Sequence, residues 1–273
     1  MYRICFLIFC VAISVSSYGQ TQTDASGKKQ GYWKKKDEKT GKLIYEGLFK
    51  DNVPQGIFKY YYPHDSIKAI MDFRQGGKIA YSTMFHLNGK KMAYGKYIGE
   101  AKDSVWTYYD ETSALISREK FKDGKKNGTV YVYFPDGVVS EERNYKMDVQ
   151  DGPFKLYFDQ KLVKGEGMYV NGKLEGKNAY YYPNGVSAAV GYYKNGKKVG
   201  PWIYKSSNGK VTEKELYKNG ELASKKETDE FFNKNKVADE KPKPEATGTK
   251  TTTVKPKTTT TKTTAKTKPA GTK

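Results

Sequence analysis

Few side chains in this sequence have the chemistry of a catalytic or metal-binding site. Of the two histidines, His64 follows Pro63 in a turn-like segment, and His86 replaces a residue that is usually aromatic; two histidines alone fall short of a structural zinc site. The paired carboxylates Glu141 and Glu142 are of the type that hydrolases use, but they are equally typical of solvated charges on a strand edge. The sequence has no phosphate-binding or dinucleotide-binding glycine motif. We therefore expect no catalytic, cofactor-binding or metal-binding residues.

Aromatic side chains interleaved with lysines are the other feature with binding chemistry, because such rings can stack on bases or sugars. The chain contains 24 Tyr, 12 Phe and 3 Trp. Where three tyrosines follow one another, they cannot all point to one side of a strand, since successive side chains alternate between the two faces. The sequence therefore predicts an exposed binding face that includes Tyr60, Tyr61, Tyr62, Tyr180, Tyr181 and Tyr182.

The aromatic residues recur with a period of 24, which defines eight repeat units. The units start at Gly31, Gly56, Ala80, Ser104, Gly128, Gly152, Gly176 and Gly200, and one extra residue near Gly41 lengthens the first unit. Positions are counted from these starts, with the insertion left out of the count. Position 2 is aromatic in five units, as Trp33, Phe58, Trp106, Phe154 and Trp202. Position 17 is aromatic in every unit and predicts a structural row of Phe49, Phe73, Tyr97, Phe121, Tyr145, Tyr169, Tyr193 and Tyr217.

Each unit has the pattern of a β-hairpin. Two aromatic-rich segments are separated by turn residues such as Pro183-Asn184-Gly185, and Asn-Gly pairs such as Asn195-Gly196 favour tight hairpin turns. No unit shows an apolar period of 3.6, which disfavours helix. We predict an all-β fold, an elongated antiparallel sheet of about eight tandem β-hairpin repeats over residues 31–223, with a closed barrel as the less natural alternative. Positions 2 and 5 have opposite parity, so either a bulge brings their rings to one face or they lie on different faces.

The first 19 residues have the order of a signal peptide. Arg3 precedes an apolar run over residues 4–15, and small residues at Ser17 and Gly19 suit a cleavage site. We expect cleavage near Gly19-Gln20, export to the periplasm, cell envelope or exterior, and a linker over 20–30. Both cysteines lie in residues 1–19, so the mature chain is expected to contain no thiol chemistry.

The C-terminal residues differ in composition from the repeats. Ser224 and Glu227 have the spacing of a capping box, which indicates a short capping helix over 224–240. Lys, Thr and Pro dominate residues 241–273, a composition typical of a disordered tail. Of the formal net charge of +19, this tail carries +8 and Arg3 carries +1, which leaves +10 on residues 20–240. Contact with anionic polymers or membranes is thus one expectation for the tail.

The repeat resembles a known family. Segments such as Tyr193–Gly200, Gly200-Pro201-Trp202 and Tyr217–Gly220 follow the pattern G-x-W-x-x-Y-Y-x-x-x-G, then an aromatic residue, then N-G-K-x-x-G. This pattern resembles the MORN repeat, most closely its bacterial variant, over about residues 31–223. The resemblance implies successive β-hairpins in an elongated, twisted sheet, and contact with proteins or membrane lipids rather than catalysis. Some bacterial members are labelled as antitoxins.

These observations predict an exported, non-catalytic repeat scaffold without a cofactor, which binds an unidentified protein or a cell-surface polymer. One alternative is binding of anionic lipid or nucleic acid through the basic repeats and tail; weak membrane contact fits this better than nucleic acid. The other alternative is an antitoxin-like partner of a toxin protein.

Overall fold

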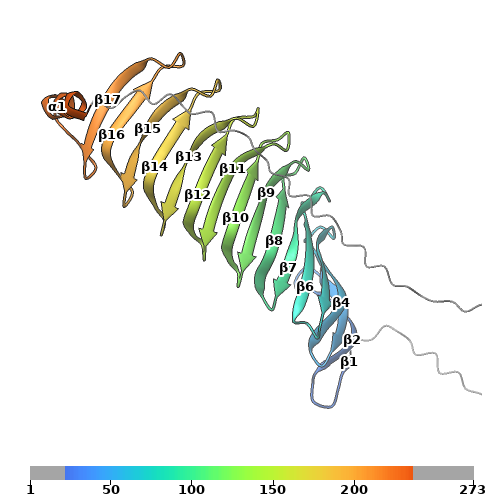
Figure 1. The fold of residues 1–273 in the computed structure, drawn as a ribbon. Helices are drawn as coiled ribbons and strands as arrows, with labels where there is room; N and C mark the ends of the chain where they lie inside the picture. The colour runs from blue at the N-terminus through green and yellow to red at the C-terminus, as the bar shows by residue number, and fades with distance from the viewer. Residues whose placement is uncertain (1–21, 236–273) are drawn as a thin grey trace, which may run out of the picture. The chain divides into compact units, whose positions relative to one another are not determined.

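The computed structural model describes residues 22–235, which form one antiparallel sheet followed by one helix (Figure 1). Each strand pairs with the next strand along the chain, from β1 to β18, so the sheet is an open meander. The predicted all-β fold of tandem hairpins is confirmed. The period of 24 is visible in the odd-numbered strands from β5 to β17, which start at residues 67, 91, 115, 139, 163, 187 and 211.

The elements have the following bounds. They are β1 (Gln22–Thr23), β2 (Lys29–Lys36), β3 (Leu43–Lys50), β4 (Val53–Tyr61), β5 (Ile67–Arg74), β6 (Ile79–Phe85), β7 (Lys91–Ile98), β8 (Ala101–Tyr109), β9 (Leu115–Lys122), β10 (Lys125–Tyr133), β11 (Val139–Lys146), β12 (Val149–Tyr157), β13 (Val163–Val170), β14 (Lys173–Tyr181), β15 (Ser187–Lys194), β16 (Lys197–Lys205), β17 (Val211–Lys218), β18 (Glu221–Leu222) and α1 (Lys225–Asn235).

The segments on either side of the repeats differ in part from the sequence-based expectation. The linker predicted over 20–30 contains β1 and the first residues of β2, because Gln22 and Thr23 pair with Gln30 and Lys29. Helix α1 lies inside the segment for which a capping helix is predicted. It is too short and polar to cross a membrane, and no other helix occurs between residues 22 and 235. The predicted signal peptide (1–19) and tail (241–273) lie outside the described residues.

A bulge at position 0 marks the first strand of most units. Gly56, Gly176 and Gly200 have φ angles of 64°, 69° and 65°, which L-residues rarely adopt. At this point the pairing with the preceding strand shifts register, as between β3 and β4 and between β15 and β16. Ser104 takes the same conformation with a φ of 61°. Ala80 does not, and β5 and β6 pair without a register shift.

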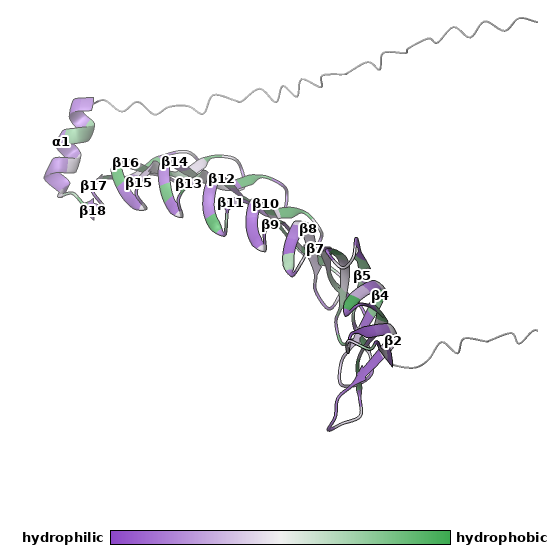
Figure 2. Cartoon of the chain, turned by 90° about the horizontal axis from the view of Figure 1, so that it is seen from below, coloured by the Kyte–Doolittle hydropathy of each residue, from purple (hydrophilic) through white to green (hydrophobic). Residues whose placement is uncertain are grey.

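The largest fully buried side chains of the described residues all lie at position 2, although Trp33 in the first unit is only half-buried. Trp106 is 0% exposed, Trp202 and Phe58 are 1% exposed, and the smaller residues that replace the ring in other units are equally buried. We define the aromatic face as the face of the sheet that carries position 2. Apolar residues recur in each hairpin rather than in one part of the chain, so the core is divided among the repeats (Figure 2).

The predicted row at position 17 lies on the aromatic face, beside position 2. Tyr97 meets Trp106 edge-on with ring centroids 4.8 Å apart, and Tyr193 meets Trp202 at 5.2 Å in the same way. Seven of the eight rings remain half-buried, and Phe121 is the buried one. The position 17 rings therefore flank the deepest column of the core, and position 2 forms it.

Candidate functional site

Lysines of the chain itself occupy the aromatic clusters. The Lys102 ammonium lies 4.7 Å from the centroid of the Trp106 ring and donates a 2.7 Å hydrogen bond to the Tyr108 hydroxyl. Lys198 lies 4.4 Å from the Trp202 ring and donates to Tyr204 at 2.9 Å. Burial lowers the pKa of Lys102. Because these rings already hold internal cations, the aromatic face contributes mainly to stability.

The six tyrosines predicted to form one exposed face are half-buried and lie in three different places. Tyr60 and Tyr180 lie on the aromatic face; the ring of Tyr60 is 6.4 Å from that of Phe58. Tyr61 and Tyr181 lie on the opposite face and donate to carboxylates. Tyr62 and Tyr182 lie at the loop edge and donate to the main-chain carbonyls of Phe85 and Lys205, both at 2.9 Å. The prediction of a single face is therefore corrected, because neighbouring residues of a strand alternate in direction.

On the opposite face, tyrosines at position 5 pair with glutamates of the preceding unit. Tyr61 donates to Glu46 at 2.7 Å, and Tyr157 donates to Glu142 at 3.0 Å. Burial, together with the adjacent carboxylate, raises the pKa of Tyr61 and of Tyr157 to about 12. The same hydrogen bond from Tyr61 lowers the pKa of Glu46. These pairs link consecutive hairpins. Of the two alternatives for positions 2 and 5, the structure therefore shows the second, with position 2 on the aromatic face and position 5 on the opposite face.

The residues considered for acid–base or metal chemistry make structural contacts. Glu141 accepts a hydrogen bond from Arg143 at 2.7 Å, whereas its neighbour Glu142 accepts from a tyrosine on the other face. His86 Nε2 lies 3.0 Å from the carbonyl oxygen of Tyr109 and links two loops, and His64 is an exposed turn residue. Within residues 22–235, no three His, Cys, Asp or Glu side chains are grouped as metal ligands would be.

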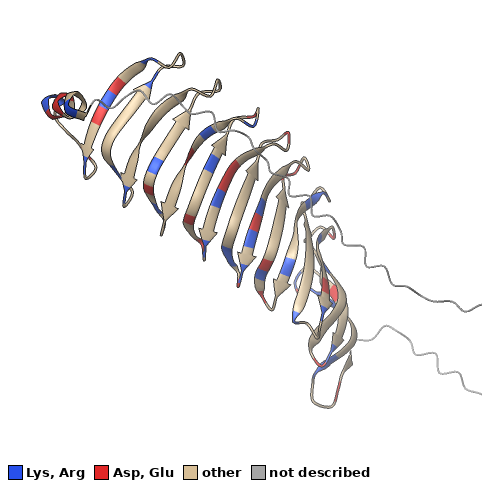
Figure 3. Ribbon diagram, viewed as in Figure 1, with Lys and Arg blue, Asp and Glu red and all other residues tan. Residues whose placement is uncertain are grey.

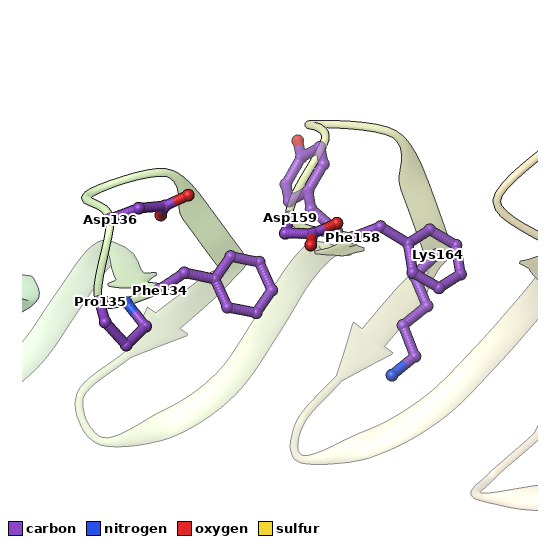
Figure 4. A pocket seen from close by; sticks show the side chains of 7 residues that line it. Phe134, Pro135, Asp136, Phe158, Asp159 and Lys164 are labelled. Carbon is purple, nitrogen blue, oxygen red and sulfur yellow. The ribbon is translucent and has the colours of Figure 1, made fainter.

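A hollow lies between two neighbouring hairpin loops (Figure 4). Phe134 and Phe158 line it at position 6, where Tyr62, His86 and Tyr182 of other units form bonds to the next loop. A phenyl ring cannot form such a bond. The hollow is thus explained by the replacement of a polar ring that links two loops in other units.

The opposite face carries a repeated set of side chains, which we name the opposite-face row. It takes position 1 from the first strand and position 16 from the second strand of each unit, so every strand from β2 to β17 contributes one residue. Within each unit the two members are register partners, for example Tyr32 with Leu48 and Pro201 with Leu216. Between most units the bulge shifts the register, and position 16 pairs with the residue before the next unit start, as Leu48 does with Gln55. The row consists of Tyr32, Leu48, Ile57, Asp72, Tyr81, Lys96, Val105, Lys120, Thr129, Asn144, Pro153, Met168, Lys177, Tyr192, Pro201 and Leu216.

Large apolar side chains are exposed at both ends of this row. In the N-terminal units Leu48 is 45% exposed, Ile57 54% and Val105 50%. In the C-terminal units Met168 is 40% exposed and Tyr192 45%. The middle is polar, and Thr129 donates to Asn144 there at 2.8 Å. Charged side chains alternate in sign along strands such as β9, so that Arg118 and Lys120 lie on the opposite face and Glu119 on the aromatic face (Figure 3).

Helix α1 packs against β17, the strand that carries the last residue of the row. The Lys214 ammonium, on the same face as Leu216, lies 5.2 Å from the centroid of the Phe232 ring. The helix also forms an ion pair between Glu227 and Lys218 of β17. Leu216 is only 8% exposed, and Phe232 of α1 is 9% exposed. The face of β17 that carries the end of the row therefore already contacts a helix of the chain.

Three segments of the chain match the family described as MORN repeat variant: residues 126–147, 174–195 and 198–219. The chain carries MORN repeats. Each matched segment runs from two residues before a unit start to position 19 and thus covers one complete hairpin. The MORN resemblance seen in the sequence is confirmed.

Comparison with solved structures gives partial similarities. The crystal structure of TarM has 13% identity and a TM-score of 0.22, and the similarity covers 44% of this chain and 19% of TarM. The S. aureus TarM variant in complex with fondaparinux, alpha-GlcNAc-glycerol and UDP gives the same values. The TcdB2-TccC3-Cdc42 structure has 11% identity and a TM-score of 0.23, covering 74% of this chain and 13% of that one. The MORN-repeat chain thus spans under a fifth of these proteins, and no curated protein matches it.

Sequence reasoning did not identify the opposite-face row, although a signal for it was present. Position 16 directly precedes the aromatic position 17, so strand alternation places it on the other face. At this position four of the repeat units carry Leu48, Met168, Tyr192 and Leu216. Apolar side chains at both positions 16 and 17 indicate that both faces of the sheet pack against apolar groups.

Proposed function

We propose that this MORN-repeat protein is an exported, non-catalytic scaffold that binds another protein through the opposite-face row. The observation that carries the proposal is the exposure of Ile57, Tyr81 and Val105, at 54%, 46% and 50%, on one face of the sheet, where they alternate with the charged Asp72 and Lys96. Large exposed apolar side chains that share a face with polar residues around them are typical of interaction sites.

The N-terminal end of the row has the composition of a protein interface. Tyr81, which is 46% exposed, has the Arg74 guanidinium 4.9 Å from its ring centroid. Arg74 is also paired with Asp72 at 2.7 Å, and the next charged pair joins Lys96 and Asp103 at 2.8 Å. Aromatic and aliphatic anchors with paired charges between them are favourable for binding a folded protein.

A non-catalytic role is supported by the family and by the contacts of the chain. MORN repeats are generally binding modules, and the glutamates and His86 considered above are engaged in structural bonds. Export is supported by the signal-peptide pattern of residues 1–19. An exported scaffold would meet its partner in the cell envelope or outside the cell.

A pull-down with the mature chain tests this function. We expect an envelope protein to be retained by the wild-type chain at both low and high salt, and to be lost from the Tyr81→Glu/Val105→Glu variant. Leu87→Glu is the matched control, because Leu87 is 65% exposed but lies in a loop outside the row. Retention of only salt-labile lipid or nucleic acid would favour anionic-polymer binding instead. Equal retention by the row variant and by wild type would exclude the row.

A further inference from the structure

We propose that the C-terminal end of the opposite-face row is a seat for an amphipathic helix of the partner protein, which places an aromatic side chain against Met168 and Tyr192. This inference rests on the proposed function and names the partner's chemistry. The evidence is the helix that the chain already holds at the neighbouring position of the same row.

Helix α1 shows which chemistry this surface accepts. The Phe232 ring and Leu216 are both buried, and the Lys214 ammonium, on the same face of β17 as Leu216, lies 5.2 Å from the centroid of the Phe232 ring. The start of the helix is fixed by a capping box, in which Ser224 and Glu227 exchange hydrogen bonds of 3.0–3.3 Å. An aromatic residue on a charged helix is therefore sufficient to cover position 16 of a unit.

The two preceding units present the same position uncovered. Tyr192 and Met168 lie at position 16, one and two units before Leu216, and are 45% and 40% exposed against its 8%. At position 14, two residues earlier on the same strand, Tyr192 is accompanied by Val190 and Met168 by Glu166, whereas Leu216 is accompanied by Lys214. The uncovered surface is thus a continuation of the interface between α1 and the sheet.

The spacing of these positions leaves room for one helix at each of them. Leu216, Tyr192 and Met168 lie on β17, β15 and β13, so consecutive members are two strands apart. Two strand spacings of about 4.8 Å amount to about 9.6 Å. A helix with its side chains is about 10 Å wide. A partner helix at Tyr192 would therefore not need the space that α1 occupies at the end of the sheet.

A hollow beside Met168 has room for the aromatic side chain. It lies over β12, β13 and β14, has a volume of about 490 Å³, and is lined by Pro153, Met168 and Ala179. Ala179 is 4% exposed, so the floor is apolar and well packed. Glu166, Glu175, Lys155 and Lys177 also line it and provide both signs of charge. Helix α1 has the matching composition, since Lys225, Lys226, Asp229 and Glu230 accompany its two phenylalanines.

Methyl NMR of the complete mature chain tests the seat. The protein carries carbon-13 in its methionine methyl groups, and the probe is a synthetic peptide of residues 224–235. We expect the Met168 signal to shift in a saturable manner, and Tyr192→Glu to weaken binding at least tenfold. Met147 is the matched control, because it is 39% exposed but lies outside the row. A peptide with Phe231→Ala and Phe232→Ala should leave every signal unmoved.

The outcomes separate the two proposals. An unmoved Met168 signal, or equal shifts with the double-alanine peptide, overturns the helix seat. If the peptide instead displaced α1, the Met168 methyl signal would also stay unmoved, and the helix seat would again be overturned. If the helix seat fails this test but the Tyr81→Glu/Val105→Glu variant still does not retain the envelope protein in the pull-down, the proposed scaffold function stands without the helix seat.

Discussion

Gly191 lies directly against the indole ring of Trp202. A Cβ atom on Gly191 would lie 2.1 Å from Cδ2 of Trp202, and Gly95 has the same relation to Trp106 at 2.3 Å. In both pairs the glycine is at position 15 and the ring is at position 2 of the next unit. Where position 2 is the small Ser82, the preceding position 15 is Met71. In these three pairs the size of one residue is matched to the size of the other, whereas Phe154 lies opposite the large Arg143.

Replacement of this glycine is expected to destabilise the sheet. Gly191→Ala forces the Trp202 ring or the strand to move, and overpacking of this kind costs about 1–3 kcal/mol. Thermal unfolding should show a lower Tm. The double variant Gly191→Ala/Trp202→Val, which restores space, should lose less stability than the sum of the single changes. If the stability loss of the double variant equalled the sum of the two single losses, the contact between Gly191 and Trp202 would not limit packing.

Truncation of a ring at position 2 should cost more than truncation at position 17. Trp106 is 0% exposed, and Trp106→Ala is expected to cost about 3–5 kcal/mol. Tyr169→Ala should cost less, because Tyr169 is half-buried and flanks Phe154 with ring centroids 5.3 Å apart. Urea unfolding of the two variants makes the comparison. If Tyr169→Ala lowered the unfolding free energy more than Trp106→Ala does, position 17 rather than position 2 would be the principal core row.

One substitution at position 0 should increase stability. Ser104 has a φ of 61°, which costs an L-residue about 1–2 kcal/mol. Ser104→Gly removes this strain, and we expect a gain of up to about 1 kcal/mol in unfolding free energy. Ala80→Gly is the control, since Ala80 pairs regularly with Phe73 and a strand glycine there should cost about 0.5–1 kcal/mol. Changes of the same sign in both variants would contradict this account of the bulge.

Alkaline pH is expected to destabilise the repeats. The folded pKa of Tyr61 and of Tyr157 is about 12, above the ordinary value of 10.0. A raised pKa means that the contribution of the neutral phenol is complete below pH 10 and is lost as pH rises toward 12. The urea midpoint should therefore fall between about pH 9 and pH 12. A Tyr61→Phe/Tyr157→Phe variant should show a smaller fall, and an unchanged pH dependence would exclude these phenols as a cause.

The period of the sequence was sufficient to predict the hairpins. Asn195-Gly196 and Asn219-Gly220 occupy two-residue turns with φ angles of 53° and 80° and of 51° and 95°, as type I′ geometry requires. Local turn chemistry and a fixed repeat length determine each hairpin. They also restrict each strand to pairing with its neighbours in sequence.

The faces of the sheet were harder to predict. The ring that recurs most regularly, at position 17, is not the most buried one, because the three most buried rings at position 2, Phe58, Trp106 and Trp202, each lie against a glycine of the preceding unit. Trp202 is deeply buried since Gly191 lets it approach the strand. Conversely, Leu216 and Tyr192 have the same repeat position, but only Leu216 is buried, on the strand that contacts a helix outside the repeats. Contacts of this kind arise from tertiary structure and leave no local sequence pattern.

The two-residue strands β1 and β18 limit how the sheet can grow. Every inner strand has neighbours on both edges, whereas β1 pairs only with Lys29 and Gln30 of β2. The remaining length of β2 has an exposed lysine run, Lys34 to Lys36. Charged edges of this kind resist the addition of strands from other molecules. The ladder can therefore be extended by duplicating a hairpin within the gene, while polymerisation of finished molecules into fibres through this edge is disfavoured.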